Sequence, residues 1–97
     1  MTRLVVTAAA NNDVDKILGY LRRVAGARVA AGYGDRFSRT LDGLLRFPEA
    51  GSPRPALGSK ARIAIVSPYL LIYEYERQDD ALILLRILHS RRNITRD

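Results

Sequence analysis

The feature that most constrains this chain is a change of apolar periodicity near its middle. Before Pro48 the apolar residues recur three and four positions apart, which is the spacing of an amphipathic helix. Further along, they gather in three short runs rich in branched and aromatic residues, which indicate strands. These runs cover residues 62–66, 69–76 and 81–88. Only short turns separate them, which favours an antiparallel meander.

Two helices are expected before Pro48. The first covers 13–25, where residues 11–13 supply N-cap candidates and the acids of the first turn suit the helix dipole. Gly26 interrupts or ends it. The second runs over about 28–46 and stops at Pro48, because proline cannot continue a helix. Two helices joined so briefly are predicted to pack as an antiparallel hairpin.

A short β-branched segment, 3–7, adds a first strand and completes the predicted order β-α-α-β-β-β. Residues 48–60, with three prolines and two glycines, form one long surface connection that Leu57 is expected to anchor. The fold class predicted is α/β (α+β), with the helical hairpin packed on a mostly antiparallel sheet. A chain of 97 residues suits a single domain, 1–97.

The last two strands are apolar on both faces. Side chains alternate along a strand, so Leu82, Leu84, Arg86 and Leu88 are predicted to share one face of the last strand. Two helices can cover only one face of the sheet, and the other face is normally polar. Three explanations stay open: a curled sheet that covers itself, a partner chain across the second face, or self-association.

The composition indicates the cell compartment and the kind of partner to expect. The chain has no cysteine, which removes disulfides and thiolate chemistry and fits a reducing compartment. It shows neither a signal-peptide pattern nor an apolar run of membrane-spanning length, so a cytoplasmic protein is expected. The net charge is +6, and nearly all the cations are arginine, which makes nucleic acid or an acidic protein a candidate partner.

The sequence carries no metal, nucleotide or nucleophile motif. The single His89, the absent cysteines and the scattered acids predict neither a metal site nor a cofactor. What stands out is a basic group near the end of the chain, suited to phosphates or to an acidic protein surface. Its members are Arg86, His89, Arg91, Arg92 and Arg96. A solvated basic end is the alternative interpretation.

Three segments of the chain, 45–55, 69–75 and 84–92, together resemble those of ParE-type toxins in the RelE/ParE superfamily. The segment 45–55 resembles their helix-ending Leu-x-x-Phe-Pro-x-x-Gly-x-x-Arg segment. Residues 69–75 are similar to their Tyr-x-Ile-x-Tyr strand, and 84–92 to their closing Ile-x-Arg-Val-x-His-x-x-Arg. The three occur in the same order and spacing over nearly the whole chain.

The resemblance implies the toxin of a type II toxin–antitoxin pair that inhibits DNA gyrase or a related topoisomerase by protein–protein contact rather than by catalysis. The residues expected to contact this target are Arg86, His89, Arg91 and Arg92. The resemblance also implies a cognate antitoxin that forms a hetero-oligomer with the toxin and covers its hairpin and sheet. Residues expected at that interface are Leu18, Leu21, Tyr33, Phe37, Leu82 and Leu84.

Two other functions stay open. One is a RelE-like, ribosome-dependent mRNA interferase, which needs a proton-transfer group within reach of the scissile phosphate. The segment 92–97 has no Tyr, His or Lys, and Arg91 stays protonated, which favours a toxin that is not a nuclease. His89 is the one group that could substitute. The other is a binding module without toxicity.

Overall fold

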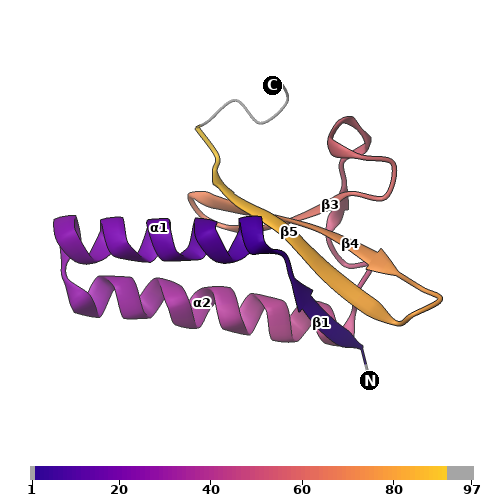
Figure 1. Cartoon of the computed structure of the whole chain (residues 1–97), viewed down its shortest axis with the longest axis horizontal. Coiled ribbons are helices and arrows are strands. Elements are labelled where there is room, and N and C mark those ends of the chain that lie inside the picture. The colour runs from indigo at the N-terminus through magenta and orange to yellow at the C-terminus, as the bar shows by residue number, and fades with distance from the viewer. Residues whose placement is uncertain (1, 92–97) are drawn as a thin grey trace.

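The computed structural model describes residues 2–91 as a hairpin of two long helices packed against a five-stranded sheet (Figure 1). The elements are β1 (Arg3–Val6), α1 (Ala8–Ala25), α2 (Ala27–Arg46), β2 (Ser52–Pro53), the short 3-10 helix η1 (Pro55–Leu57), β3 (Arg62–Val66), β4 (Tyr69–Glu76) and β5 (Ala81–His89). The predicted order is confirmed, with the two-residue β2 added. No helix within the described range is long and apolar enough to cross a membrane.

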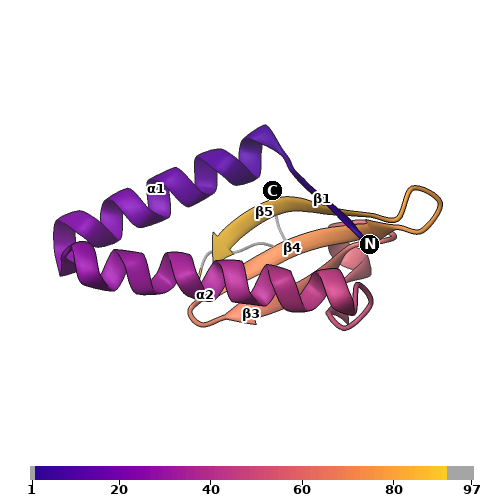
Figure 2. The ribbon, with the colours of Figure 1, turned by 90° about the horizontal axis from the view of Figure 1, so that it is seen from below.

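The strands lie in the order β1-β5-β4-β3-β2. Neighbours pair antiparallel except β1, which runs parallel to the first half of β5, from Arg3 opposite Ala81 to Val6 opposite Leu84. The mostly antiparallel sheet is thus confirmed. The hairpin is longer than the sheet is wide, and its turn extends past the strands (Figure 2).

The first helix begins earlier than predicted. It starts at Ala8, because the Thr7 hydroxyl oxygen accepts the Ala10 N–H at 3.0 Å and caps the helix, and three alanines in a row favour the helical state. Asp13 therefore lies in the second turn, and its predicted role as a first-turn acid is wrong. At the other end, Gly26 has φ 97° and lets α2 follow at once.

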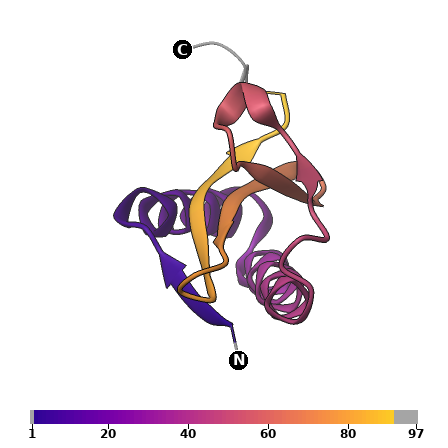
Figure 3. The same ribbon diagram turned by 90° about the vertical axis from the view of Figure 1, so that its right-hand side faces the viewer.

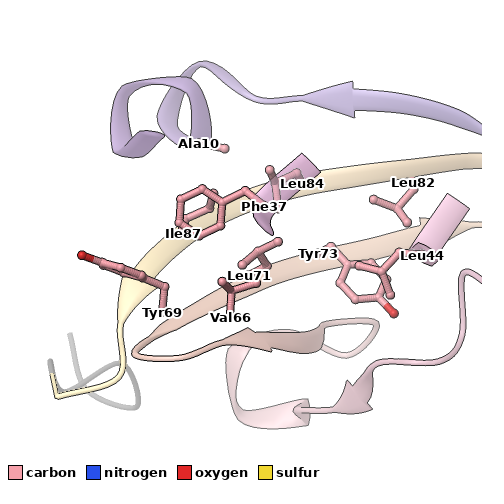
Figure 4. Close-up of a cluster of buried hydrophobic side chains, with 10 residues drawn as sticks. All are labelled: Ala10, Phe37, Leu44, Val66, Tyr69, Leu71, Tyr73, Leu82, Leu84 and Ile87. Atoms are coloured by element: carbon pink, nitrogen blue, oxygen red, sulfur yellow. The ribbon is translucent and has the colours of Figure 1, made fainter. Parts of the chain in front are cut away.

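The main core fills the space between the hairpin and the sheet (Figure 4). Its most deeply buried large side chains come from the two central strands. They are Leu71, Tyr73, Leu82, Leu84 and Ile87. From α2, Phe37 and Leu44 pack onto them.

A β-bulge changes which residues of β5 share a face. Ile72 pairs with Arg86 but Tyr73 pairs with Leu84, so Leu85 is an extra residue. Leu84 and Ile87 consequently both face the helices, whereas Leu85 packs on the opposite side of the sheet. The predicted strict alternation along this strand is wrong, because one inserted residue shifts every later side chain to the other face.

The second face of the sheet is covered by the chain itself. Ile63, Leu70 and Ile72 form a separate buried cluster, and Leu57 from the 48–60 connection packs onto it. Figure 3 shows this connection, in pink, on the side of the sheet away from α2. Leu57 is confirmed as an anchor. Of the three explanations for the doubly apolar strands, cover from within the chain is the one observed on this face, but the 48–60 connection supplies it and not the predicted curling of the sheet.

The Tyr73 hydroxyl ties the connection to the sheet. It donates to the Pro48 carbonyl at 2.8 Å and accepts the Gly51 N–H at 2.9 Å. Burial raises the pKa of Tyr73, so the phenol stays protonated and able to donate. Gly51 is required here, because a Cβ at this position would lie 2.5 Å from the Tyr73 hydroxyl oxygen.

Candidate functional site

A groove of about 970 Å³ lies between α1 and the C-terminal end of β5. It forms because β1 ends opposite Leu84, which leaves the second half of β5 without a neighbouring strand on that side. The first turns of α1 take the place of that strand (Figure 1). The Thr7 hydroxyl donates to the Leu85 carbonyl at 2.9 Å, and the Ile87 N–H donates to Asp13 at 2.9 Å.

Asp13 and Arg86 form a two-pronged ion pair on the groove wall. The guanidinium donates from Nε to Oδ2 at 2.7 Å and from Nη2 to Oδ1 at 3.0 Å. Burial by itself raises the pKa of Asp13, but the Arg86 hydrogen bonds, the Ile87 N–H and the charges of Arg86 and Lys16 outweigh it, and the pKa is lower than that of an ordinary aspartate. Arg86 is thus held in one orientation, with its charge largely balanced.

An aromatic cluster borders the groove, and its members Tyr33, Tyr69 and His89 form the groove floor. Tyr69 lies at the centre, with ring centroids 5.6 Å from Tyr33, 5.7 Å from Phe37 and 5.5 Å from His89, all edge-to-face. The His89 Nδ1 accepts the Arg91 N–H at 3.1 Å, and both residues line the groove. The groove therefore combines apolar rings with cations.

The structure brings together the predicted target-contacting residues that it describes. Arg86, His89 and Arg91 all line this groove. Arg92, like Arg96, lies outside the described residues. The role of these side chains in target binding stays a prediction, but they now share one site.

The residues predicted to contact an antitoxin divide into two groups. Leu21 and Tyr33 line the groove, and Leu18 is half-buried beside the core. Phe37, Leu82 and Leu84 are only 4%, 0% and 1% exposed, so no partner can reach them in this conformation, and their predicted contacts are corrected. These three are core residues. Apolar spacing alone does not distinguish a core contact from an interface contact.

The groove residues that were not predicted from the sequence include Asp13, Lys16, Tyr20 and Arg23. In the sequence, Asp13 was explained by its expected place at the start of a helix. Its partner Arg86 lies 73 positions away, so no local pattern predicted the ion pair. Lys16, Tyr20 and Arg23 are spaced three and four residues apart, which places them on one helix face. That spacing was readable, but nothing in the sequence showed that this face meets the end of the last strand.

The remaining basic side chains near β3 lie in a second, smaller depression at the far end of β4. Lys60 pairs with Glu76 at 3.2 Å, and Arg77 pairs with Glu49. Arg62 donates to the carbonyl oxygens of Glu49 and Gly51. The charges here are balanced within the protein. Across residues 2–91 there is no cluster of three or more His, Asp or Glu side chains that could hold a metal ion.

Solved structures with this fold include bacterial toxins. The chain is similar to the chromosomal ParDE TA system from P. aeruginosa, with a TM-score of 0.77 and 20% identity over 92% of this chain and 96% of that one. It is also similar to the isolated E. coli RelE toxin, with a TM-score of 0.66 and 16% identity over 96% and 88% of the two chains. For the intact E. coli RelBE toxin-antitoxin complex the TM-score is 0.63, with 18% identity over 95% and 100%. At these identities the likeness establishes the fold of the RelE/ParE toxins. No curated protein matches the chain.

The family follows from the sequence match. The family model described as "ParE toxin of type II toxin-antitoxin system, parDE" matches residues 4–94. The chain therefore belongs to the ParE toxin family and is a type II toxin of the RelE/ParE superfamily.

Proposed function

We propose that this toxin acts by protein–protein contact on DNA gyrase or a related topoisomerase, without catalysis and without a cofactor. The target surface is the groove between α1 and the end of β5, where Arg86, His89 and Arg91 lie together above an aromatic floor. This juxtaposition carries the proposal. The residues that contribute most of the binding free energy at protein–protein interfaces are enriched in aromatic side chains and arginine.

The distribution of basic groups supports contact rather than RNA cleavage. Tyr69 and Glu76 are the first and last residues of β4, and seven residues of strand span about 23 Å. The groove lies at the Tyr69 end and Lys60 at the Glu76 end, so the two sets of cations cannot act on one phosphate. Acid–base catalysis requires its groups within hydrogen-bond reach of the reacting atoms.

We further propose that a cognate antitoxin binds the toxin in the cytoplasm as a hetero-oligomer. Two of the structural neighbours are toxin–antitoxin assemblies, ParDE and RelBE. Of the residues predicted at the antitoxin interface, Leu18, Leu21 and Tyr33 are the ones that stay partly exposed, so an antitoxin segment can still reach them.

The test compares supercoiling by purified DNA gyrase in the presence of the wild-type toxin and of two charge-reversal variants. Arg91→Glu is expected to raise the half-inhibitory concentration about tenfold, the equivalent of about 1.4 kcal/mol. The control, Arg39→Glu, reverses an exposed arginine of α2 that lies outside the groove and is expected to leave inhibition unchanged.

Two results would contradict the proposal. Unimpaired supercoiling together with codon-phased cuts in messages from expressing cells would establish the mRNA interferase instead. Harmless high-level expression without antitoxin would favour a binding module that is not toxic.

A further inference from the structure

The outer edge of β5 offers backbone groups to the groove. The Leu85 carbonyl and the Ile87 N–H both point away from β4, since they bond to Thr7 and Asp13. In a strand, the N–H and C=O of one residue point to the same side, and the pattern repeats every second residue. The carbonyl of Ile87 and the N–H and carbonyl of His89 therefore also face the groove, beyond the point where β1 ends.

The wall opposite this edge is cationic. Lys16 and Arg23 are exposed on α1 and face the groove from that side, and the sequence has no acid from position 16 to position 34. The groove is lined by four cations, Lys16, Arg23, Arg86 and Arg91, and by two carboxylates, Asp13 and Asp15. Because Asp13 is bound to Arg86, the excess charge that a ligand meets is positive.

An apolar anchor point lies between the wall and the edge. Tyr20 is a large side chain that is 53% exposed, and it lines the groove together with Tyr33 and Tyr69. Aromatic rings arranged around a depression accept one apolar side chain of a partner. A second copy of this chain is a poor occupant, because each copy carries a net charge of +6.

We propose that the groove binds an extended acidic segment of the target protein, which adds to the outer edge of β5 as a further strand. Its backbone pairs with the Ile87 carbonyl and with the N–H and carbonyl of His89, its carboxylates meet Lys16, Arg23 and Arg91, and one apolar side chain rests on Tyr20 and Tyr69. Strand addition supplies affinity through main-chain hydrogen bonds, and specificity through alternate side chains. This inference rests on the proposed function and identifies the part of the target that is recognised.

The test measures binding of the full-length toxin to purified DNA gyrase and to the co-expressed antitoxin. Lys16→Glu combined with Arg23→Glu is expected to weaken gyrase binding on the order of 10- to 100-fold, through lost attraction to the acidic segment. Arg39→Glu combined with Arg46→Glu makes the same change of charge on exposed residues of α2 outside the groove, and its affinity for gyrase is expected to match the wild type. A thermal melt of each variant confirms that it is folded.

Hydrogen exchange then tests the strand itself. The His89 amide is expected to gain protection when gyrase binds, which a purely electrostatic contact would not cause. If gyrase binding is lost without protection at His89, or if the groove variant loses antitoxin but keeps gyrase, the inference is overturned while the proposed function stands. If the wild-type toxin does not bind gyrase at all, both fail.

Discussion

Replacing Asp13 by alanine removes three hydrogen bonds at the point where α1 meets the uncovered end of β5. Two come from Arg86 and one from the Ile87 N–H, and the Asp13 residue is only 9% exposed. The structure offers no other described strand to satisfy that N–H, because β1 has already ended. The loss of folding free energy therefore includes the cost of a buried Ile87 N–H without an acceptor as well as the lost ion pair with Arg86.

The magnitude follows from the exposure of each partner. A buried N–H without an acceptor costs about 1–3 kcal/mol. The Arg86 side chain is 48% exposed, so water can solvate it after the change, and the lost ion pair adds only about 1 kcal/mol. We expect Asp13→Ala to lower the free energy of unfolding by about 2–4 kcal/mol and the Tm by roughly 10–30 °C. Asp13→Asn keeps an oxygen that can accept the Ile87 N–H and is expected to cost about half as much.

Thermal and urea denaturation followed by circular dichroism measure these changes. Asp15→Ala is the matched control, since Asp15 is an exposed acid two positions along the same helix. If Asp13→Ala proved as stable as this control, the ion pair would not hold α1 against β5. The account of how the groove is built would then be wrong.

The same comparison has a defined pH dependence. The pKa of Asp13 is lower in the folded protein than in the unfolded chain. Its contribution to the free energy of unfolding is therefore complete above about pH 4–5 and is lost as the pH falls through the folded pKa. The stability difference between wild type and Asp13→Ala should therefore shrink in acid. Asp80, whose pKa is lowered by hydrogen bonds from Thr2 and Tyr75, is present in both proteins and cancels.

Three further substitutions test the core and the 48–60 connection. Gly51→Ala would place a Cβ 2.5 Å from the Tyr73 hydroxyl and should cost about 1–3 kcal/mol in urea denaturation, whereas Gly32→Ala meets nothing within 4 Å and should stabilise α2 slightly. Tyr73→Phe leaves a buried N–H without its acceptor and should lower the unfolding free energy by about 1–3 kcal/mol. Leu84→Asp puts a charge where the side chain is 1% exposed and should abolish the cooperative melt, while Ile65→Asp, at 67% exposed, should melt near the wild type. If the Leu84→Asp variant were folded and stable but failed to bind the antitoxin, Leu84 would be an interface residue and not a core residue.

Much of the fold could be predicted from the sequence because it depends on neighbouring residues. The bounds of β3 and β4 match the predicted 62–66 and 69–76, since a two-residue turn containing proline leaves little choice of where each strand ends. Both helices were predicted by their apolar spacing, and Pro48 set the end of the second. The start of α1 was missed, because Thr7 and the alanines after it favour an earlier helix than the polar residues 11–13 suggested.

The candidate site depended on contacts that no local pattern contains. The bulge at Leu85 arises from the register between β4 and β5, and it alone determines that Ile87 shares a face with Leu84. Asp13 reaches Arg86 only because β1 is too short to cover the whole of β5, which lets α1 lie along the remaining edge. The sequence by itself therefore determined the elements, their order and a basic chain end. Only the tertiary structure decided that Arg86, His89 and Arg91 meet one face of α1, because strand register and edge exposure are set between segments far apart in the chain.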